Sequence, residues 1–142
     1  MGGVCRDPEG QYFVWSSPFS LTTQACLVYS SNPTGDVTIN DIELGALLMT
    51  MLLFVPRISP LAHIHTYVNK TESQGWANRG SVSTASSVGP ILWGLSLAAR
   101  RQHIHASVGR IPGDNSNMAD AALRLTHLPD RKFLSHFPTN FP

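Results

Sequence analysis

Short runs rich in aromatic and β-branched residues predict four β-strands along the chain. The first two, residues 3–7 and 11–17, flank the turn signal at 8–10 (PEG) and predict a hairpin. Residues 62–68 (AHIHTYV) and 103–111 (HIHASVGRI) predict two further strands, each with a period of two. In the first of these, the period places the side chains at 63, 65 and 67 on one face.

Longer apolar runs predict helices between and after these strands. Asn40 is suited to cap a helix whose first turn carries Asp41 and Glu43, both favoured by the positive end of the helix dipole, and which runs to about Phe54. Three further helices are expected over residues 72–78, 90–102 and from 116 or 117 through 125. The order of strands and helices is typical of an α/β or mixed α+β fold with a mixed sheet.

Composition limits the domain count and the charge-driven functions. With 142 residues, 42% hydrophobic and 13% charged, residues 1–142 have the size of a single domain with one modest core. The formal net charge of +1 gives no global attraction to nucleic acid, so such binding depends on a local patch such as Arg100 with Arg101.

Targeting and cysteine usage favour an intracellular protein, nuclear or cytoplasmic. Residues 1–6 lack the apolar run of a signal peptide, and Cys5 and Cys26 lack the spacing of a metal site or a disulfide framework. The most apolar stretch, residues 44–55, is about half of what a bilayer core requires, so we expect a buried helix and no membrane partner.

Three motifs occur in order along the chain. They are NDIELGA at 40–46, YVNKT at 67–71 followed by GWANRGS at 75–81, and RIPG at 110–113 followed by NMAD at 117–120. Together they resemble the ribonuclease H domain of retrotransposon polyproteins, which accompanies reverse transcriptase. The resemblance spans nearly the whole chain and implies a ribonuclease H-like mixed sheet flanked by helices.

The resemblance also implies a reaction and a set of site residues. Family members cut RNA in an RNA/DNA hybrid with two Mg²⁺ ions held by four acidic residues. Glu43 and Asp120 match two of these positions and are the expected metal ligands, whereas the third position is Asn69. The fourth acid belongs to the family's first, central strand, which would precede Met1, so the domain is expected to be truncated.

Two substitutions at the expected catalytic site predict a pseudoenzyme. An amide at Asn69 carries no charge to hold divalent ions, and Arg110 replaces a family histidine just before the Ile-Pro-Gly turn at 111–113. We therefore expect a catalytically inactive, retroelement-derived module that binds protein or nucleic acid. The alternative is an Mg²⁺-dependent endonuclease completed by the missing strand or by a partner, and a third possibility is a transposon fragment with an unrelated role.

The missing central strand and the basic residues predict partners. A gap in the sheet leaves backbone groups unpaired, which favours a protein partner or a homodimer that completes the sheet. Arg79, Arg100 and Arg101 are candidates for phosphate contacts with an RNA/DNA hybrid or other nucleic acid, and a solvated charged face is the equal alternative.

Several residues have a structural interpretation beside the functional one. Glu43 is also an ordinary first-turn carboxylate, and Asp120 an ordinary polar position on an amphipathic helix. Two histidine pairs, at 63 and 65 and at 103 and 105, can in principle present four imidazoles to Zn²⁺, but exposed strand histidines are the favoured interpretation. The tryptophans at 15, 76 and 93 are expected in the core rather than stacked on bases.

Overall fold

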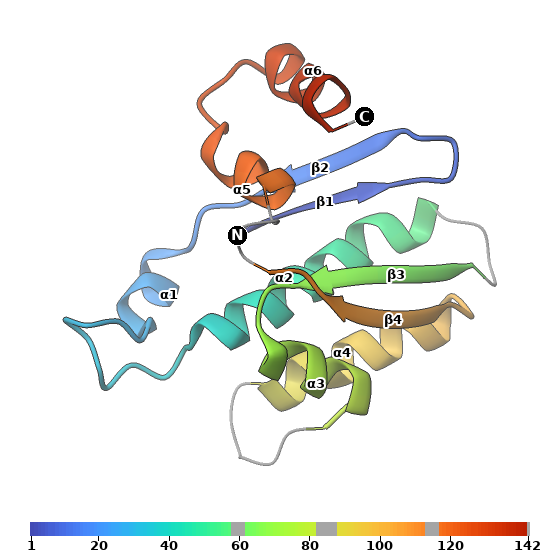
Figure 1. Ribbon diagram of the computed structural model, residues 1–142. Coiled ribbons are helices and arrows are strands. Elements are labelled where there is room, and N and C mark those ends of the chain that lie inside the picture. The colour runs from blue at the N-terminus through green and yellow to red at the C-terminus, as the bar shows by residue number, and fades with distance from the viewer. Residues whose placement is uncertain (58–61, 82–87, 113–116, 142) are drawn as a thin grey trace.

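A computed structural model describes residues 1–57, 62–81, 88–112 and 117–141 of the chain (Figure 1). Its elements are, in order, β1 (Gly2–Arg6), β2 (Tyr12–Ser16), α1 (Leu21–Cys26), α2 (Ile39–Phe54), the 3-10 turn η1 (Val55–Arg57), β3 (His63–Val68), α3 (Thr71–Arg79), α4 (Val88–Arg101), β4 (His105–Arg110), α5 (Asn117–Arg124) and α6 (Asp130–Asn140). The mixed α and β class expected from the sequence is confirmed, and the predicted elements occur in the expected order, with α1 inserted after the hairpin.

The strands form two separate two-stranded sheets within the described residues. β1 and β2 are an antiparallel hairpin with Val4 opposite Val14, whereas β3 and β4 are parallel with His65 opposite Ser107. The single mixed sheet implied by the family resemblance is not seen: no backbone ladder joins the two sheets in the described part of the chain.

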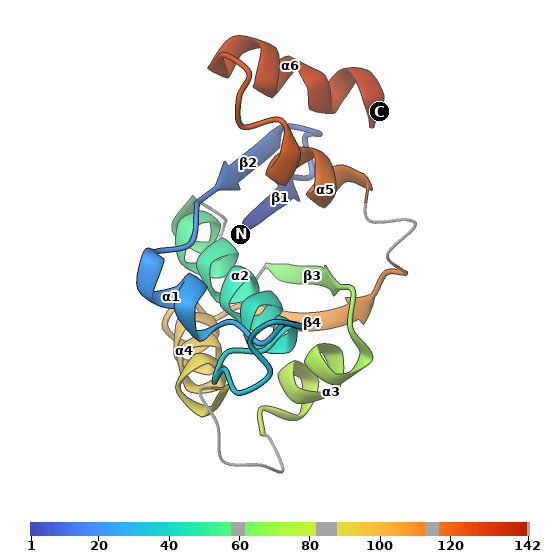
Figure 2. The same ribbon diagram turned by 90° about the vertical axis from the view of Figure 1, so that its left-hand side faces the viewer.

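Helix α2 connects the two sheets. Figures 1 and 2 both place β1 and β3 as the inner strands, with α2 running along both. On the hairpin side, Nε1 of Trp15 donates to Oγ1 of Thr50 at 2.9 Å, and the rings of Phe13 and Phe54 lie 5.5 Å apart. On the other side, Val68 of β3 belongs to the same buried cluster as the inner face of α2.

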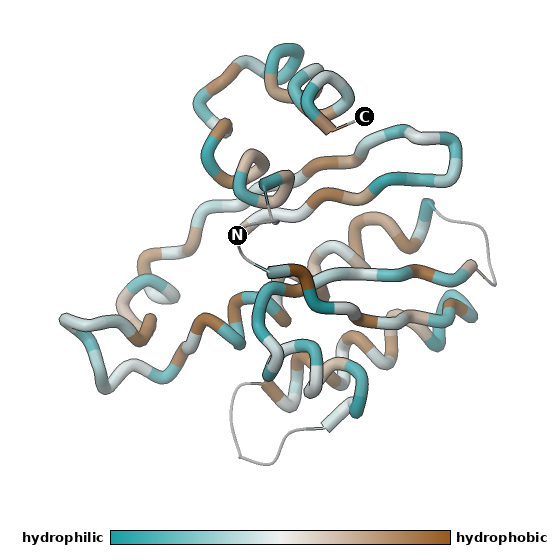
Figure 3. The backbone as a smooth tube through the Cα atoms, in the orientation of Figure 1, coloured by the Kyte–Doolittle hydropathy of each residue, from teal (hydrophilic) through white to brown (hydrophobic). Residues whose placement is uncertain are grey.

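The main core lies between α2, α4 and the inner face of β3 and β4. Its buried members are Leu44, Leu47, Met51, Val55, Val68, Val88, Leu92, Ile104 and Val108. Figure 3 shows β3 alternating between hydrophilic and hydrophobic colours, as expected for a strand with one buried face. The period-two prediction that His63, His65 and Tyr67 share one face is confirmed, since all three are exposed.

Helix α2 begins earlier than the sequence predicted. Its N-cap is Thr38 rather than Asn40: the Thr38 side chain accepts from the backbone N–H of Asp41, and the Asp41 carboxylate accepts from the backbone N–H of Thr38 at 2.6 Å. This capping box satisfies two helix-end donors reciprocally and explains why Asp41 is buried.

Helix α2 and the turn η1 together form a longer apolar segment than the stretch 44–55 that the sequence singled out. Ile39–Arg57 is long and apolar enough, by length and composition, to cross a membrane. One face contacts the core, while Met49, Leu52 and Leu53 are exposed. A core helix passes the same test of length and composition, so the absence of a membrane partner stays a prediction.

Two helices were not predicted. α1 is only six residues long, and its signal is a single cap in which the Ser20 side chain accepts from the backbone N–H of Thr23. α6 contains Pro138, which removes a helix donor and argues against a helix in sequence. Within α6, Phe137 is fully buried, whereas Leu134 is half exposed.

The predictions for His103 and Trp93 were wrong, and three others concern positions outside the described residues. His103 lies outside β4, with a φ of 52°, in the turn that follows α4. Trp93 is 70% exposed instead of buried, because it lies on the outer side of α4. The serine-rich link at 82–87, the RIPG glycine at 113 and residue 116 lie outside the described residues.

Candidate functional site

Three of the four predicted site residues meet at the carboxyl end of β3. Oε2 of Glu43, in α2, accepts from the backbone N–H of Lys70 at 3.0 Å. Nε of Arg110, at the end of β4, donates to the backbone oxygen of Asn69 at 3.3 Å. The turn at Asn69 and Lys70 is thus flanked by a carboxylate on one side and a guanidinium on the other.

These contacts have a structural role. Lys70 is the N-cap of α3 and makes no side-chain cap hydrogen bond. The Glu43 carboxylate satisfies the backbone N–H of this residue and places negative charge at the N-terminus of α3, where the helix dipole favours it. Glu43 therefore connects α2 to the junction of β3 and α3, a role that its sequence context did not indicate.

Asp120 is not brought into this cluster by any contact among the described residues. It lies in α5 with its side chain 49% exposed, and its Oδ2 forms an i,i+4 ion pair of 3.4 Å with Arg124. α5 packs on the hairpin instead, with Leu123 close to Gly2. Exposed pairs of this kind contribute little to stability.

The donor set does not fit the two Mg²⁺ ions of the resembling family. Two such ions require several converging carboxylates, whereas this cluster contains one carboxylate, that of Glu43, beside the uncharged residue Asn69 and the cation of Arg110. Within the described ranges, moreover, no group of three His, Cys, Asp or Glu side chains is already assembled as a metal centre without side-chain rotation.

The arginines predicted to bind nucleic acid lie at two helix ends. Arg79 is in the last turn of α3, and Arg100 and Arg101 are in the last turn of α4. All three are exposed. Cations are favoured at the C-terminal ends of helices, so these positions have a structural explanation that needs no ligand.

The motif GWANRGS contributes a residue whose role was missed. The side chain of Asn78 accepts from the backbone N–H of Val108 at 3.0 Å and donates to its oxygen at 2.7 Å. Gln74 donates to the same oxygen at 3.3 Å. Through these bonds α3 covers the outer edge of β4, and only the tertiary structure pairs these distant positions.

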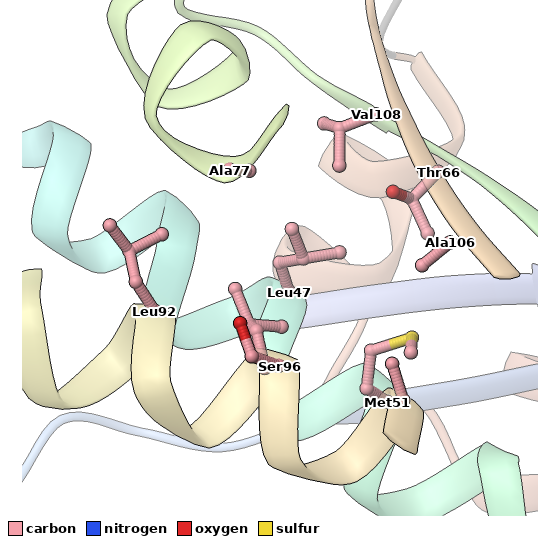
Figure 4. A pocket seen from close by; sticks show the side chains of 10 residues that line it. Leu47, Met51, Thr66, Ala77, Leu92, Ser96, Ala106 and Val108 are labelled. Atoms are coloured by element: carbon pink, nitrogen blue, oxygen red, sulfur yellow. The ribbon is translucent and has the colours of Figure 1, made fainter. Parts of the chain in front are cut away.

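An apolar pocket of about 150 Å³ lies between α2, α4 and the inner face of β3 and β4 (Figure 4). It is lined by Leu47, Met51, Thr66, Ala77, Leu92, Leu95, Ser96, Ala99, Ala106 and Val108. The hydroxyls of Thr66 and Ser96 are its only polar side-chain groups among these residues. The pocket is a gap in core packing and offers no group for acid, base or nucleophilic chemistry.

Comparison with known proteins does not identify a family. No protein-family model, no curated protein and no solved structure matches this chain. The resemblance to ribonuclease H therefore stays a prediction from the ordered motifs of the sequence.

Proposed function

We propose that this chain is a non-catalytic, retroelement-derived module of the ribonuclease H type that binds an extended polypeptide strand between β1 and β3. The observation that carries the proposal is that both inner strands have an unpaired backbone edge. An unpaired edge is a template for strand addition, in which the main chain supplies the hydrogen bonds.

The open edge of β1 follows from the hydrogen-bond alternation in the hairpin. Met1 and Ser17 exchange backbone hydrogen bonds at 2.7 and 2.8 Å, which sets the phase of the antiparallel ladder. Alternate residues of β1 therefore bond to β2, and the backbone groups of Gly2, Val4 and Arg6 point to the opposite edge.

The open edge of β3 follows in the same way. The backbone N–H of His105 donates to the oxygen of Ala62, and that of Ile111 donates to the oxygen of Val68. The even-numbered residues of β3 therefore bond to β4. The backbone groups of the three odd-numbered residues, His63, His65 and Tyr67, point to the opposite edge.

The outer edge of β4, unlike the inner edges of β1 and β3, is hydrogen-bonded to a helix. Its outer edge is covered by α3, since Asn78 bonds to both backbone groups of Val108. Native proteins cover or pair the edges of sheets to prevent unwanted pairing. In the described part of the chain, no side chain bonds to the edge backbone groups of Gly2, Val4, His63, His65 or Tyr67 in this way, which supports the use of these edges for binding.

Strand direction and support are compatible with a single added strand. β1 and β3 run in opposite directions (Figure 1), so one strand can be antiparallel to β1 and parallel to β3 at the same time. α2 contacts both sheets and supplies one apolar wall for the strand's alternate side chains. Proteins from elsewhere and a second copy of this chain are both candidate donors of such a strand.

The test fuses a designed six-residue strand of alternating valine and threonine to Met1 through a short Gly/Ser linker. We expect the fusion to be more stable to urea than the natural chain, and the amides of Val4 and His65 to exchange more slowly. Sedimentation of the natural chain at increasing concentration tests in parallel whether a second copy donates the strand.

The matched control carries proline at every second position of the same designed strand. Proline removes ladder donors but keeps the linker and the approximate apolar content. Equal stability and equal amide exchange in the fusion and its control would overturn the proposal.

The second candidate function is a nuclease that an added strand completes. The proximity of Glu43 to the turn at Asn69 favours it, since these positions correspond to two ligands in the resembling family. Its test is the fusion with an aspartate in the added strand together with Asn69→Asp. Mg²⁺-dependent cleavage of an RNA/DNA hybrid that is lost on Glu43→Gln would support this candidate, and an inert protein would remove it.

A further inference from the structure

Three histidines gather on the exposed face of β3 and β4. His63 and His65 are on β3, and His105 lies directly opposite His63 on β4. The rings of His63 and His105 are 4.7 Å apart, and those of His63 and His65 are 6.5 Å apart. The parallel register thus brings together imidazoles that are about 40 positions apart in the sequence.

Two of these rings point a nitrogen at the same atom. Nε2 of His63 lies 2.9 Å and Nδ1 of His65 lies 2.6 Å from Oγ of Ser107. A hydroxyl has one proton, so it donates to one ring and accepts from the other. Both nitrogens are therefore already within hydrogen-bond distance of one point above the sheet.

The surroundings of His65 fix its ring in this orientation. The Tyr67 ring stands edge-on to it at 4.7 Å. Gly109 lies beneath, and a Cβ at that position would come within 2.9 Å of Nε2 of His65. A glycine on β4 and an aromatic neighbour thus leave room for this ring orientation, which lowers the cost of ordering it when a ligand binds.

From this geometry we propose that His63, His65 and His105 bind a divalent transition-metal ion of the class that prefers imidazole, such as Zn²⁺. For the ion to bind, the Ser107 side chain rotates away from the two rings, and the ion becomes the common partner of the two converging nitrogens at a distance of about 2.0–2.1 Å. The ring of His105, which is exposed, turns from its edge-on contact with His63 to supply the third nitrogen.

The ligand chemistry selects the metal class. Neutral imidazole suits Zn²⁺, Cu²⁺ and Ni²⁺, whereas Mg²⁺ and Ca²⁺ require oxygen ligands. Three protein ligands leave one position of a tetrahedral ion to water. The site lies on side chains perpendicular to the sheet, so it does not depend on strand addition at the edges of β1 and β3.

The test is calorimetric titration of the full chain with Zn²⁺, and with Mg²⁺ as the selectivity control. We expect one Zn²⁺ per chain and no Mg²⁺ binding at this site. His65→Ala and His63→Ala should each weaken Zn²⁺ binding by at least about tenfold, since loss of even an outer-shell partner weakens a metal site this much.

The matched control is His103→Asn, which removes a nearby imidazole that lies outside β4. Asparagine tolerates the positive φ of this position, so the fold should be retained. We expect its Zn²⁺ affinity to remain within about threefold of that of the natural chain, which is far less than the loss at a ligand position.

Histidine ring resonances provide a measurement that does not depend on the folding of any variant. On addition of Zn²⁺ to the natural chain, the ring signals of His63, His65 and His105 should shift together, while those of His127 and His136 should not. Zn²⁺ binding that His65→Ala leaves intact, or shifts confined to other histidines, would overturn the proposal, and so would an absence of binding.

Discussion

The carboxylate of Glu43 accepts a hydrogen bond from the backbone N–H of Lys70 across 27 positions of sequence, at 3.0 Å. This bond connects α2, just beyond its first turn, to the N-cap of α3. The family resemblance assigns Glu43 to a metal site, whereas the contact gives the same side chain a structural use that survives without any metal.

Substitution of Glu43 separates these two uses. Glu43→Ala should lower the free energy of unfolding by about 1 kcal/mol because the Lys70 N–H loses its acceptor, and Glu43→Gln, which keeps an acceptor oxygen, should lower it less. Urea unfolding with and without Mg²⁺ measures both effects. A Mg²⁺-dependent stabilisation that disappears in Glu43→Gln would instead assign Glu43 to a metal site.

Gly3 is predicted to hold the hairpin against α2. A Cβ at Gly3 would come within 2.5 Å of Nε1 of Trp15 and 2.6 Å of Oγ1 of Thr50, which are hydrogen-bonded to each other. Gly3→Ala should therefore destabilise the chain by about 2 kcal/mol, as overpacking usually does.

The control for this prediction is Gly89→Ala in α4. A Cβ at Gly89 meets nothing within 4 Å, so alanine should stabilise the helix by up to about 1 kcal/mol through propensity alone. Thermal unfolding of both variants shows whether the melting temperature falls in Gly3→Ala and rises in Gly89→Ala. If Gly3→Ala leaves the melting temperature unchanged, the close docking of β1 on α2 is wrong.

Ser73 is a buried hydroxyl without a hydrogen-bond partner in the described part of the chain. It is fully buried in α3, so Ser73→Ala should stabilise the chain by about 1 kcal/mol by removing an unsatisfied polar group. Ser96→Ala, at a solvent-exposed position of α4 that borders the apolar pocket, measures the gain from replacing a helical serine that water reaches. Urea midpoints that move equally in both variants would contradict the burial argument.

Cys5 predicts a loss of stability in alkaline solution. Burial raises the pKa of its thiol above the ordinary value of 9.0, and the carboxylate of Asp7 raises it further. The unfolded thiol ionises at a lower pH than the folded one, so its contribution is complete below about pH 9 and is lost as the pH rises towards the folded pKa.

The measurement compares urea unfolding at pH 8 and pH 10 for the natural chain and for Cys5→Ala. The natural chain should lose more stability than the variant over this interval, and Cys5 should be alkylated more slowly in the folded than in the unfolded chain. An equal loss in both proteins would show that other groups account for the pH dependence.

The sequence predicted the elements that depend on local signals. The hairpin was visible from a turn signal between aromatic and β-branched runs, and α2 from an apolar run that follows capping residues. α6 was missed because Pro138 argues locally against a helix, yet burial of Phe137 stabilises one in the folded chain. The exposure of Trp93 was missed because residue type alone does not indicate which helix face meets the core.

The candidate site was predicted only in part, because short motifs identify residues but not the packing that brings them together. The motifs singled out Glu43, Asn69 and Arg110, and the fold brings all three to the end of β3. The ion pair of Asp120 with Arg124 is local to α5, but the docking of α5 on the hairpin is not encoded in any short motif. Hydrogen bonds such as those from Asn78 to Val108 depend on residues 30 positions apart.

The sequence by itself therefore determined the order and type of most elements and the exposed histidine face of β3, because these follow from residue type and from periods of two or 3.6 positions. The tertiary structure alone decided which strands pair, which edges stay open and which imidazoles converge on Ser107. Those features depend on register and packing between distant segments, which no local periodicity specifies.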